Sequence, residues 1–440
     1  MGLPRVSRQR CTAGSLLVAG HALLACQPTG RPQVPLAAAS PTLLAACAAS
    51  DPDHSHVEPT AAAQKDGVGA DPLLAAVKQS NAASFALWSA FAEQGNFVVS
   101  PYSIRSALSL VYLASAAGSG RDKLREGLRY PERNDDLGIR LLDGALQAAE
   151  GARLESTNAV WFARQLTLSS SYSDAASRIV PAEFHPIDFA GDPGRAREAI
   201  NAWVSERTRG KIPHILEGGA ITEQTQVALI NAMYFRAGWR DAFDPELTTR
   251  KRFLTARGTV SQAEMMQGAS CLAVFCGDYQ AALVGYRDTS LAFVVVVPVD
   301  WRSFRWAAPV FRRVWTDLDK GRHAELELPK FTIRTRRALG RVLGRLDIGL
   351  GDPQLLSGMF VSAEPTMSGS VIHEAVIEVA ELETEAAAAT AIGSEAISFT
   401  ETEPTPVFRV DRPFYFLLVE RKTGLIAFMG QVTDPTAGGG

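Results

Sequence analysis

The order of helical and extended patterns constrains this chain more than any single motif does. Apolar residues first recur mainly at helical spacing, which predicts helices over 71 or 80 to 94, 101–117, 121–129, 135–150 and 196–210. Later runs mainly predict strands, over 226–236, 252–266, 271–298, 324–335, 371–380, 413–420 and 424–431. The exceptions are early strands and late helices, at 96–101, 154–163, 304–320 and 336–346. Helices clustered early and strands clustered late indicate an α+β fold and not alternating βαβ units.

The composition excludes several classes of protein. Of the 440 residues, 44 are Lys or Arg and 47 are Asp or Glu, so the formal net charge is −3 and a strongly basic nucleic-acid binder is excluded. Hydrophobic residues make up 46% of the chain, enough to bury a large core. Five cysteines are too few for a disulfide scaffold. Cys271 and Cys276 are expected to be free, buried thiols.

The N-terminus has the pattern of an export signal. Arginines precede a short apolar stretch that ends in Leu23-Leu24-Ala25-Cys26. This end resembles a bacterial lipobox, in which the acylated cysteine tethers the protein to a membrane; Cys47 is a second candidate, and an ordinary signal peptide is the alternative. Residues 27–70 contain eleven Ala, six Pro and no aromatic residue, which is typical of a flexible tether. We therefore expect a signal at 1–26, a tether at 27–70 and a folded domain at 71–440. The protein is expected to be exported, as a cell-envelope lipoprotein or an extracellular protein.

The usual motifs of catalytic sites are missing from the sequence. His373-Glu374 begins like the zinc motif HExxH, but Ile377 stands where the second histidine is required. GxSxG, P-loop and CxxC motifs do not occur. We therefore expect no enzymatic activity, no metal site and no cofactor.

Four segments together resemble the serpin family of protease inhibitors. They are NFVVSPYSI (96–104), AINAWVSERTRGKI (199–212), LINAMYFRAGWRDAF (229–243), and HEAVIEVAELETEAAAAT (373–390) with RPFYFLLVERKTGLIAFMGQVTDP (412–435). They occur in the family's order and cover about residues 75–435. The resemblance implies three β-sheets, eight to nine helices and an exposed reactive-centre loop that begins near Glu383. It also implies a suicide substrate, which is cleaved in this loop, holds the protease as an acyl-enzyme and inserts the loop as a new strand into the main sheet.

The hinge implied by the resemblance is Glu383, Thr384, Glu385, Ala386, Ala387, Ala388, Ala389 and Thr390. Side chains alternate between the two faces of a strand, so Thr384, Ala386, Ala388 and Thr390 would face the core, and all are small. The family usually has Gly where this chain has Glu383. A charged residue at this position is expected to slow insertion of the loop into the main sheet. It therefore favours an alternative function, a non-inhibitory serpin that serves as a surface binding protein or a protease substrate.

The scissile bond implied by the usual loop length is Ile397–Ser398, although a site two to five residues later stays open. No Lys or Arg occurs between Thr384 and Phe408, which disfavours trypsin-like targets. The expected partner is a serine protease of elastase-, chymotrypsin- or subtilisin-like specificity; a cysteine protease, or a glutamyl-specific protease acting at Glu395, is an alternative. The protein is expected to be a monomer.

Two further groups of residues match positions in the family. Ser100, Ser103, Asn231 and His373 resemble the polar cluster beneath the opening of the main sheet. Trp239, Lys330 and Glu381 resemble the residues at the point where the loop first inserts. In the second group, Lys330 and Glu381 are expected to form an ion pair.

Overall fold

The computed structural model of the chain describes residues 71–91, 93–131, 138–147, 152–287, 290–361, 365, 371–382 and 404–437. The expected signal, the tether, Cys26, Cys47, the hinge at 383–390 and the Ile397–Ser398 bond lie outside these residues. Within them, no helix has the length and hydropathy that a membrane span requires.

The described residues contain eight α-helices, within the expected eight to nine. They are α1 (Pro72–Phe91), α2 (Pro101–Ala114), α3 (Ser119–Leu128), α4 (Ile139–Gln147), α5 (Ser170–Ile179), α6 (Pro193–Arg207), α7 (Ala308–Leu318) and α8 (Gly340–Gly344), with a 3-10 helix η2 at Pro353–Leu356. Helix α2 shows why such helices begin where they do. Ser100 caps it by accepting from the Ser103 N–H at 3.1 Å, and Pro101 occupies its first position.

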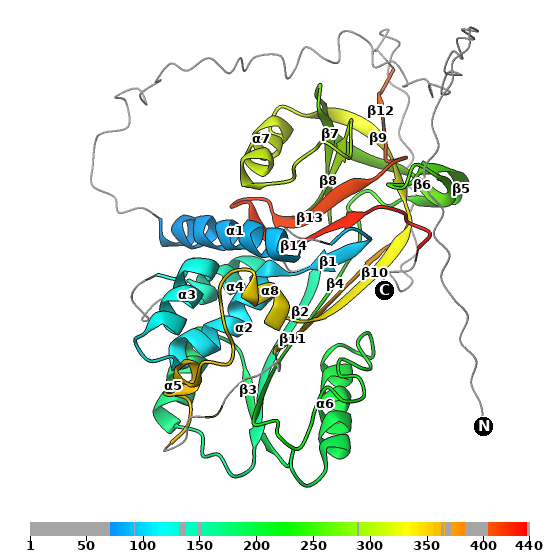
Figure 1. The fold of residues 1–440 in the computed structure, drawn as a ribbon. Coiled ribbons are helices and arrows are strands. Elements are labelled where there is room, and N and C mark those ends of the chain that lie inside the picture. The colour runs from blue at the N-terminus through cyan, green and yellow to red at the C-terminus, as the bar shows by residue number, and fades with distance from the viewer. Residues whose placement is uncertain are drawn as a thin grey trace, which may run out of the picture. The chain divides into compact units, whose positions relative to one another are not determined.

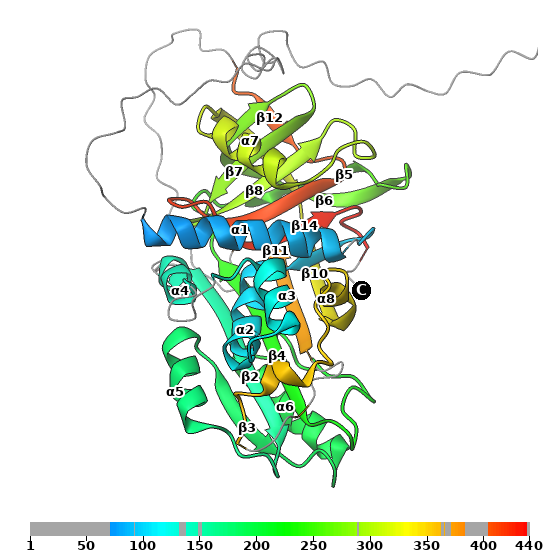
Figure 2. The same cartoon turned by 60° about the vertical axis from the view of Figure 1, so that its left-hand side comes forward.

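A five-stranded sheet forms one layer, in the order β10 (Phe331–Ala338), β11 (Val371–Val379), β4 (Val227–Ala237), β2 (Ala152–Ala163) and β3 (Glu183–Ile187). Its central strand β4 is apolar at nearly every position because both faces of the sheet are covered. Leu229 packs in the core shared with α2, and Ile230 packs in the core shared with α6. Figures 1 and 2 show α2 and α6 on opposite faces of this sheet.

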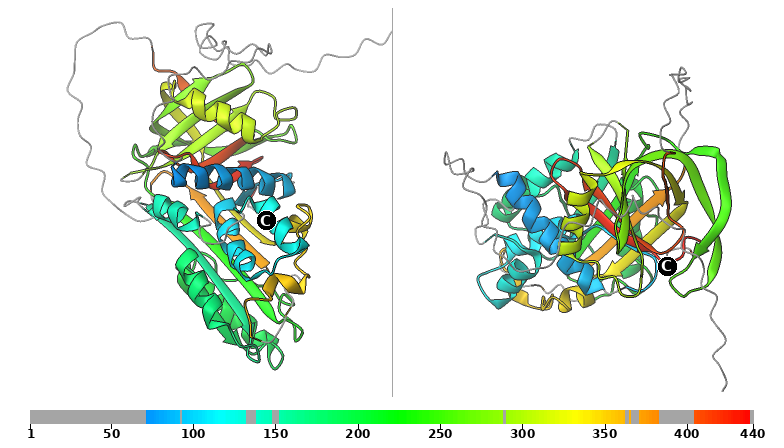
Figure 3. Two further views of the ribbon diagram at one scale, coloured as in Figure 1. Left: turned by 90° about the vertical axis from the view of Figure 1, so that its left-hand side faces the viewer. Right: turned by 90° about the horizontal axis from the view of Figure 1, so that it is seen from above.

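The other strands form a nine-stranded sheet. Its order is β1 (Phe97–Val99), β14 (Leu425–Val432), β13 (Phe414–Glu420), β8 (Leu291–Pro298), β7 (Tyr279–Gly285), β6 (Val260–Phe275), β9 (Arg322–Pro329) and β12 (Val407–Arg409), with β5 (Asp244–Leu254) also paired to β6. Three sheets were expected, but the described strands form two hydrogen-bonded sheets. The long strand β6 pairs with β7, β5 and β9 and so joins them into one sheet. Figure 3 shows α1 lying along this sheet, where it packs on β14.

Several boundaries differ from the sequence predictions. The strand expected at 324–335 is two strands, β9 and β10, which separate at Lys330 and enter different sheets. The strand expected at 252–266 is likewise split between β5 and β6, and the helix expected at 336–346 is reduced to α8. Helix α5 and strand β3 were not predicted. Cys271 is a free, buried thiol, but the prediction for Cys276 is wrong, because Cys276 is disulfide-bonded.

Candidate functional site

The junction between β11 and β4 is the central feature of the candidate site. The two strands are parallel and pair directly from Val371 with Leu229 to Ile377 with Phe235, so no strand lies between them. Beyond this last pair, β11 continues to Val379 and β4 continues to Ala237 without pairing to each other. The seam between the strands is therefore closed along most of its length and open at its C-terminal end.

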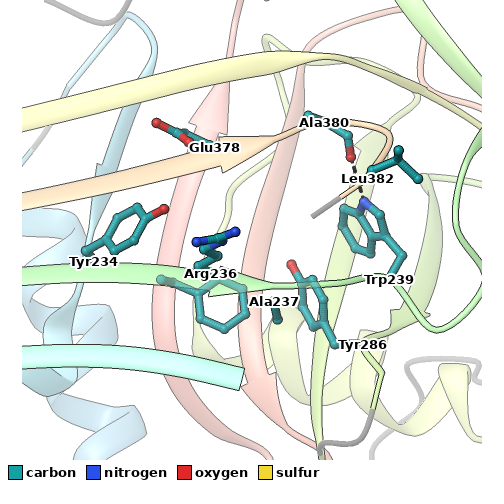
Figure 4. A pocket seen from close by; sticks show the side chains of 9 residues that line it. Tyr234, Arg236, Ala237, Trp239, Tyr286, Glu378, Ala380 and Leu382 are labelled. Carbon is teal, nitrogen blue, oxygen red and sulfur yellow. Dashed lines mark hydrogen bonds between the residues drawn. The ribbon is translucent and has the colours of Figure 1, made fainter. Parts of the chain in front are cut away.

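A pocket occupies the open end of the seam (Figure 4). It is lined by residues of both strands, of the segments that follow them, and by Tyr286 after β7. The lining residues are Tyr234, Phe235, Arg236, Ala237, Trp239, Tyr286, Glu378, Ala380 and Leu382. The indole Nε1 of Trp239 donates to the carbonyl of Ala380 at 2.8 Å. The Trp239 ring stacks on Tyr286 at 4.6 Å between centroids, and Phe243 and Phe293 meet it edge-on. This packing fixes the direction in which the chain leaves β11.

Glu381 anchors the same segment one residue later. Its carboxylate accepts from Lys330 Nζ and from the Thr248 hydroxyl, both at 2.9 Å. Partial burial acts to raise the pKa of Glu381, but the ammonium of Lys330, a backbone N–H and the Thr248 hydroxyl outweigh it and hold that pKa below its usual value. Trp239, Lys330 and Glu381 thus lie around the same turn, where the sequence resemblance places them.

A buried polar cluster crosses the seam at its other end. His373 on β11, Asn231 on β4 and Asn158 on β2 are paired in register across three adjacent strands. His373 Nδ1 contacts Asn231 Oδ1, and Asn231 Nδ2 donates to Asn158 Oδ1 at 2.8 Å. The structure therefore links the two strands of the seam by side chains as well as by backbone.

Helix α2 completes this cluster from beneath the sheet. Asn231 Nδ2 also donates to Ser103 Oγ at 2.6 Å, and Ser103 Oγ contacts Ser156 Oγ at 3.2 Å. Ser100 donates its backbone N–H to His373 Nε2 at 3.4 Å and its hydroxyl to the Ala427 carbonyl at 2.7 Å. The four residues predicted from the sequence are together. Asn158 and Ser156 were missed, because only the register of β2 against β4 brings them there.

These contacts require a neutral His373. Nε2 accepts from the Ser100 N–H, so the ring proton lies on Nδ1 and is donated to Asn231. Complete burial lowers the pKa of His373 to about 3 because the charged imidazolium would lose its hydration.

Stability is therefore expected to depend on pH through His373. The unfolded chain takes up a proton near pH 6.5 and the folded chain does not until about pH 3. The contribution of His373 to the free energy of unfolding is therefore complete above pH 6.5. It is lost as the pH falls below this value, at up to about 1.4 kcal/mol per pH unit. Urea unfolding of the wild type and of His373→Gln from pH 7.5 to 4.5 measures it. The variant should show the shallower slope, and equal slopes would contradict the assignment. His323→Gln, at an exposed position on β9, is the matched control.

A third group holds the strand that follows the undescribed segment. The chain leaves the five-stranded sheet after β11 and returns as β12, which pairs in parallel with β9 at the edge of the nine-stranded sheet. Glu327 on β9 accepts from Arg409 on β12 at 2.6 Å and from Lys251 on β5 at 2.9 Å. The Glu327 side chain is 10% exposed, so these cations stabilise a largely buried carboxylate. No sequence motif indicated this group.

Charged side chains also join the segment after α6 to the seam. Lys211 pairs with Glu378 of β11 at 2.9 Å. Arg334 on β10 pairs with the buried Glu374 at 2.6 Å and donates to the Lys211 carbonyl at 2.5 Å. These contacts fasten the segment near Lys211 over β11. Among the described residues, no group of three or more His, Cys, Asp or Glu side chains is arranged to hold a metal ion.

Comparison with known proteins agrees with this geometry. The family model described as "Serpin (serine protease inhibitor)" matches residues 78–435. The chain belongs to the serpin family. Serpins are in general inhibitors whose targets are proteases, and not catalysts.

Individual serpins are similar over most of the chain. An uncharacterized serpin-like protein of Thermococcus kodakarensis is 30% identical, over 82% of this chain and 86% of its own. The crystal structure of native protease nexin-1 with heparin has a TM-score of 0.72 at 23% identity and covers 83% of this chain and 100% of its own. The crystal structure of human thyroxine-binding globulin with thyroxine has the same TM-score at 22% identity and covers 83% of this chain and 100% of its own. The two structures share the serpin fold.

Proposed function

We propose that this serpin inhibits serine proteases as a suicide substrate. The protease cleaves the segment between β11 and β12, forms an acyl-enzyme, and is held in that state when the segment inserts between β11 and β4. The observation that carries the proposal is the seam itself. It is a directly paired, parallel junction, open at the end from which the segment emerges.

The free energy for insertion comes from strand pairing. A new strand replaces the single ladder of seven residue pairs between β11 and β4 by two ladders. The added ladder and its apolar contacts contribute on the order of 10 kcal/mol, at about 1 kcal/mol per hydrogen bond plus burial. Separation of the strands must first break the contact between His373 and Asn231, which forms a barrier.

The sequence of the segment suits insertion and limits the target. Thr384, Ala386, Ala388 and Thr390 share one face in a strand and are small enough for the core. The segment has no Lys or Arg for the S1 pocket of a trypsin-like protease. The proposed targets are elastase-, chymotrypsin- or subtilisin-like proteases acting near Ile397–Ser398.

A gel assay of the whole chain with a panel of proteases tests this proposal. At least one of elastase, chymotrypsin and subtilisin is expected to give a covalent complex that survives denaturing electrophoresis, and the mass of the released C-terminal peptide identifies the scissile bond. Trypsin is the control and should give no complex through this segment. Cleavage without a complex across the panel would overturn the inhibitory function.

The second candidate is a non-inhibitory serpin that acts as a binding protein or as a protease substrate. Glu383 favours it, because glutamate restricts the backbone where the family usually has glycine. A structural neighbour, thyroxine-binding globulin, shares the fold and holds thyroxine in its crystal structure. Cleavage without a complex in the panel, reversed by Glu383→Gly, would select this candidate.

We also propose that the protein is exported as a monomer, with residues 1–26 as the signal and 27–70 as a tether. Cys26 is the proposed site of lipid attachment. Mass spectrometry of the mature N-terminus from membrane and medium fractions tests this. A mature chain that begins at an acylated Cys26 supports the lipoprotein, and an unmodified N-terminus contradicts it.

A further inference from the structure

An open cavity of about 940 Å³ lies away from the seam and shares no lining residue with it. It is bounded by the turn after α1, the turn between β5 and β6, the segment 301–305 and the segment 433–437. The functions proposed above do not use this cavity.

Tyr415 lines the cavity and is held in a fixed position. The residue is 7% exposed, and its hydroxyl makes no hydrogen bond to the described residues. Its ring stacks on Trp301 at 4.6 Å and on Trp306 at 5.4 Å, which prevents it from turning away. Burial raises the pKa of Tyr415 to about 12, against the effect of nearby Arg305, so the hydroxyl keeps its proton at neutral pH.

Three arginines add positive charge to the same cavity. The guanidinium groups of Arg257 and Arg302 have no hydrogen-bond or ion-pair partner in the described part of the chain. Arg305 donates through Nη1 to the carbonyls of Arg302 and Ser303. The arginines therefore keep donors available for an anion.

The acidic residues that line the cavity are already engaged. Glu93 pairs with Arg337 at 3.0 Å. Asp434 Oδ1 accepts from Ser261 and from the hydroxyl of Thr436. These two acids therefore form no ion pair with the three arginines. Asp300, which lies outside the lining, interacts with the charge of Arg302.

The partly exposed residues Trp301 and Phe304 add aromatic surface to the cavity. We propose that this cavity binds a small aromatic carboxylate. Its ring would lie against Trp301 and Phe304, and its carboxylate would accept hydrogen bonds from the Tyr415 hydroxyl and the arginines. Arginine and a protonated phenol suit this role because hydrogen bonds to a charged acceptor are stronger than neutral ones. The site is independent of protease inhibition.

Calorimetric titration of the whole chain with 2-naphthoate tests the proposal, with tryptophan fluorescence as a second readout. Binding is expected, at least tenfold tighter than that of the neutral analogue 2-naphthalenemethanol or of acetate, which lacks the ring. Equal binding of naphthoate and the neutral analogue would overturn the carboxylate site, as would no binding of naphthoate at millimolar concentration.

Variants locate the binding. Tyr415→Phe removes only the hydroxyl and should weaken naphthoate binding about tenfold. The double variant Arg257→Gln/Arg302→Gln changes exposed residues only and should weaken it by a similar factor, so the test stands even if Tyr415→Phe does not fold. Arg341→Gln, an exposed arginine on α8, is the matched control and should bind as the wild type does. Unchanged affinity in both cavity variants would overturn the proposal.

Discussion

Thr384→Arg is expected to convert the protein from an inhibitor into a substrate. In the inserted strand Thr384 would face the core, where an unpaired guanidinium costs several kcal/mol. Insertion would then stall at its first inward residue, and the acyl-enzyme would hydrolyse. On denaturing gels the variant should give the cleaved chain and lose at least about nine-tenths of the covalent complex.

Glu385→Arg is the matched control, because it introduces the same side chain one residue later on the opposite face. It should retain the complex, since that face stays in water. Loss of complex in both variants would mean that charge in the hinge, and not its direction, decides the outcome. Retention of complex in Thr384→Arg would contradict insertion in the proposed register.

Thermal unfolding gives the same comparison without a protease complex. After cleavage of the loop, the wild type and Glu385→Arg should melt roughly 20 °C above the intact chain, for a gain on the order of 10 kcal/mol at about 2 °C per kcal/mol. Cleaved Thr384→Arg should melt near its intact form. Equal melting temperatures of the intact and cleaved wild type would contradict the mechanism.

Asn231→Ala is expected to destabilise the intact protein by about 3–5 kcal/mol. Asn231 hydrogen-bonds to Ser103, Asn158 and His373, and all three lie buried beneath the seam. Its removal leaves three polar side chains short of a partner in a site closed to water, at about 1–3 kcal/mol each before relaxation. Urea unfolding at pH 7.5 measures the loss.

Ser156→Ala provides a graded control for this cluster. Ser156 makes one contact of 3.2 Å with Ser103 at the edge of the cluster and is partly exposed, so its loss should cost less than about 1 kcal/mol. The Asn231→Ala variant should also lose inhibitory activity on storage faster than Ser156→Ala, because it lacks the side-chain contact that joins β11 to β4. Equal destabilisation in the two variants would contradict a central role for Asn231.

Much of the fold followed from local patterns. The apolar run at 226–236 predicted β4 to within one residue at each end, and Ser100 with Pro101 placed the start of α2. The patterns failed where local signals were weak or ambiguous. The apolar positions shift by one residue across Lys330, from Ala324, Leu326 and Leu328 to Phe331 and Ile333. The run continues on both sides of this single-residue shift, so the two strands were predicted as one.

The residues of the candidate site also fall into two groups, those that the sequence motifs identified and those that only the structure showed. The resemblance of the motifs identified Ser100, Ser103, Asn231 and His373, which the structure brings together. It did not identify Asn158, the Lys211–Glu378 pair or the contact of Arg409 with Glu327. Each of these joins residues far apart in the chain. Lys211 and Glu378 lie in two of the motifs, but neither motif indicates that the two side chains meet.

The sequence by itself determined the α+β class, the serpin family and the small residues of the hinge, because periodicity and motif spacing are local properties of the chain. Only the tertiary structure decided that β11 pairs directly with β4, that the seam opens beside Trp239, and that Tyr415 and Arg257 line the same cavity. The physical reason is that strand order, register and burial arise from contacts between distant segments. Those contacts depend on how all the layers pack together, and no local stretch of sequence specifies them.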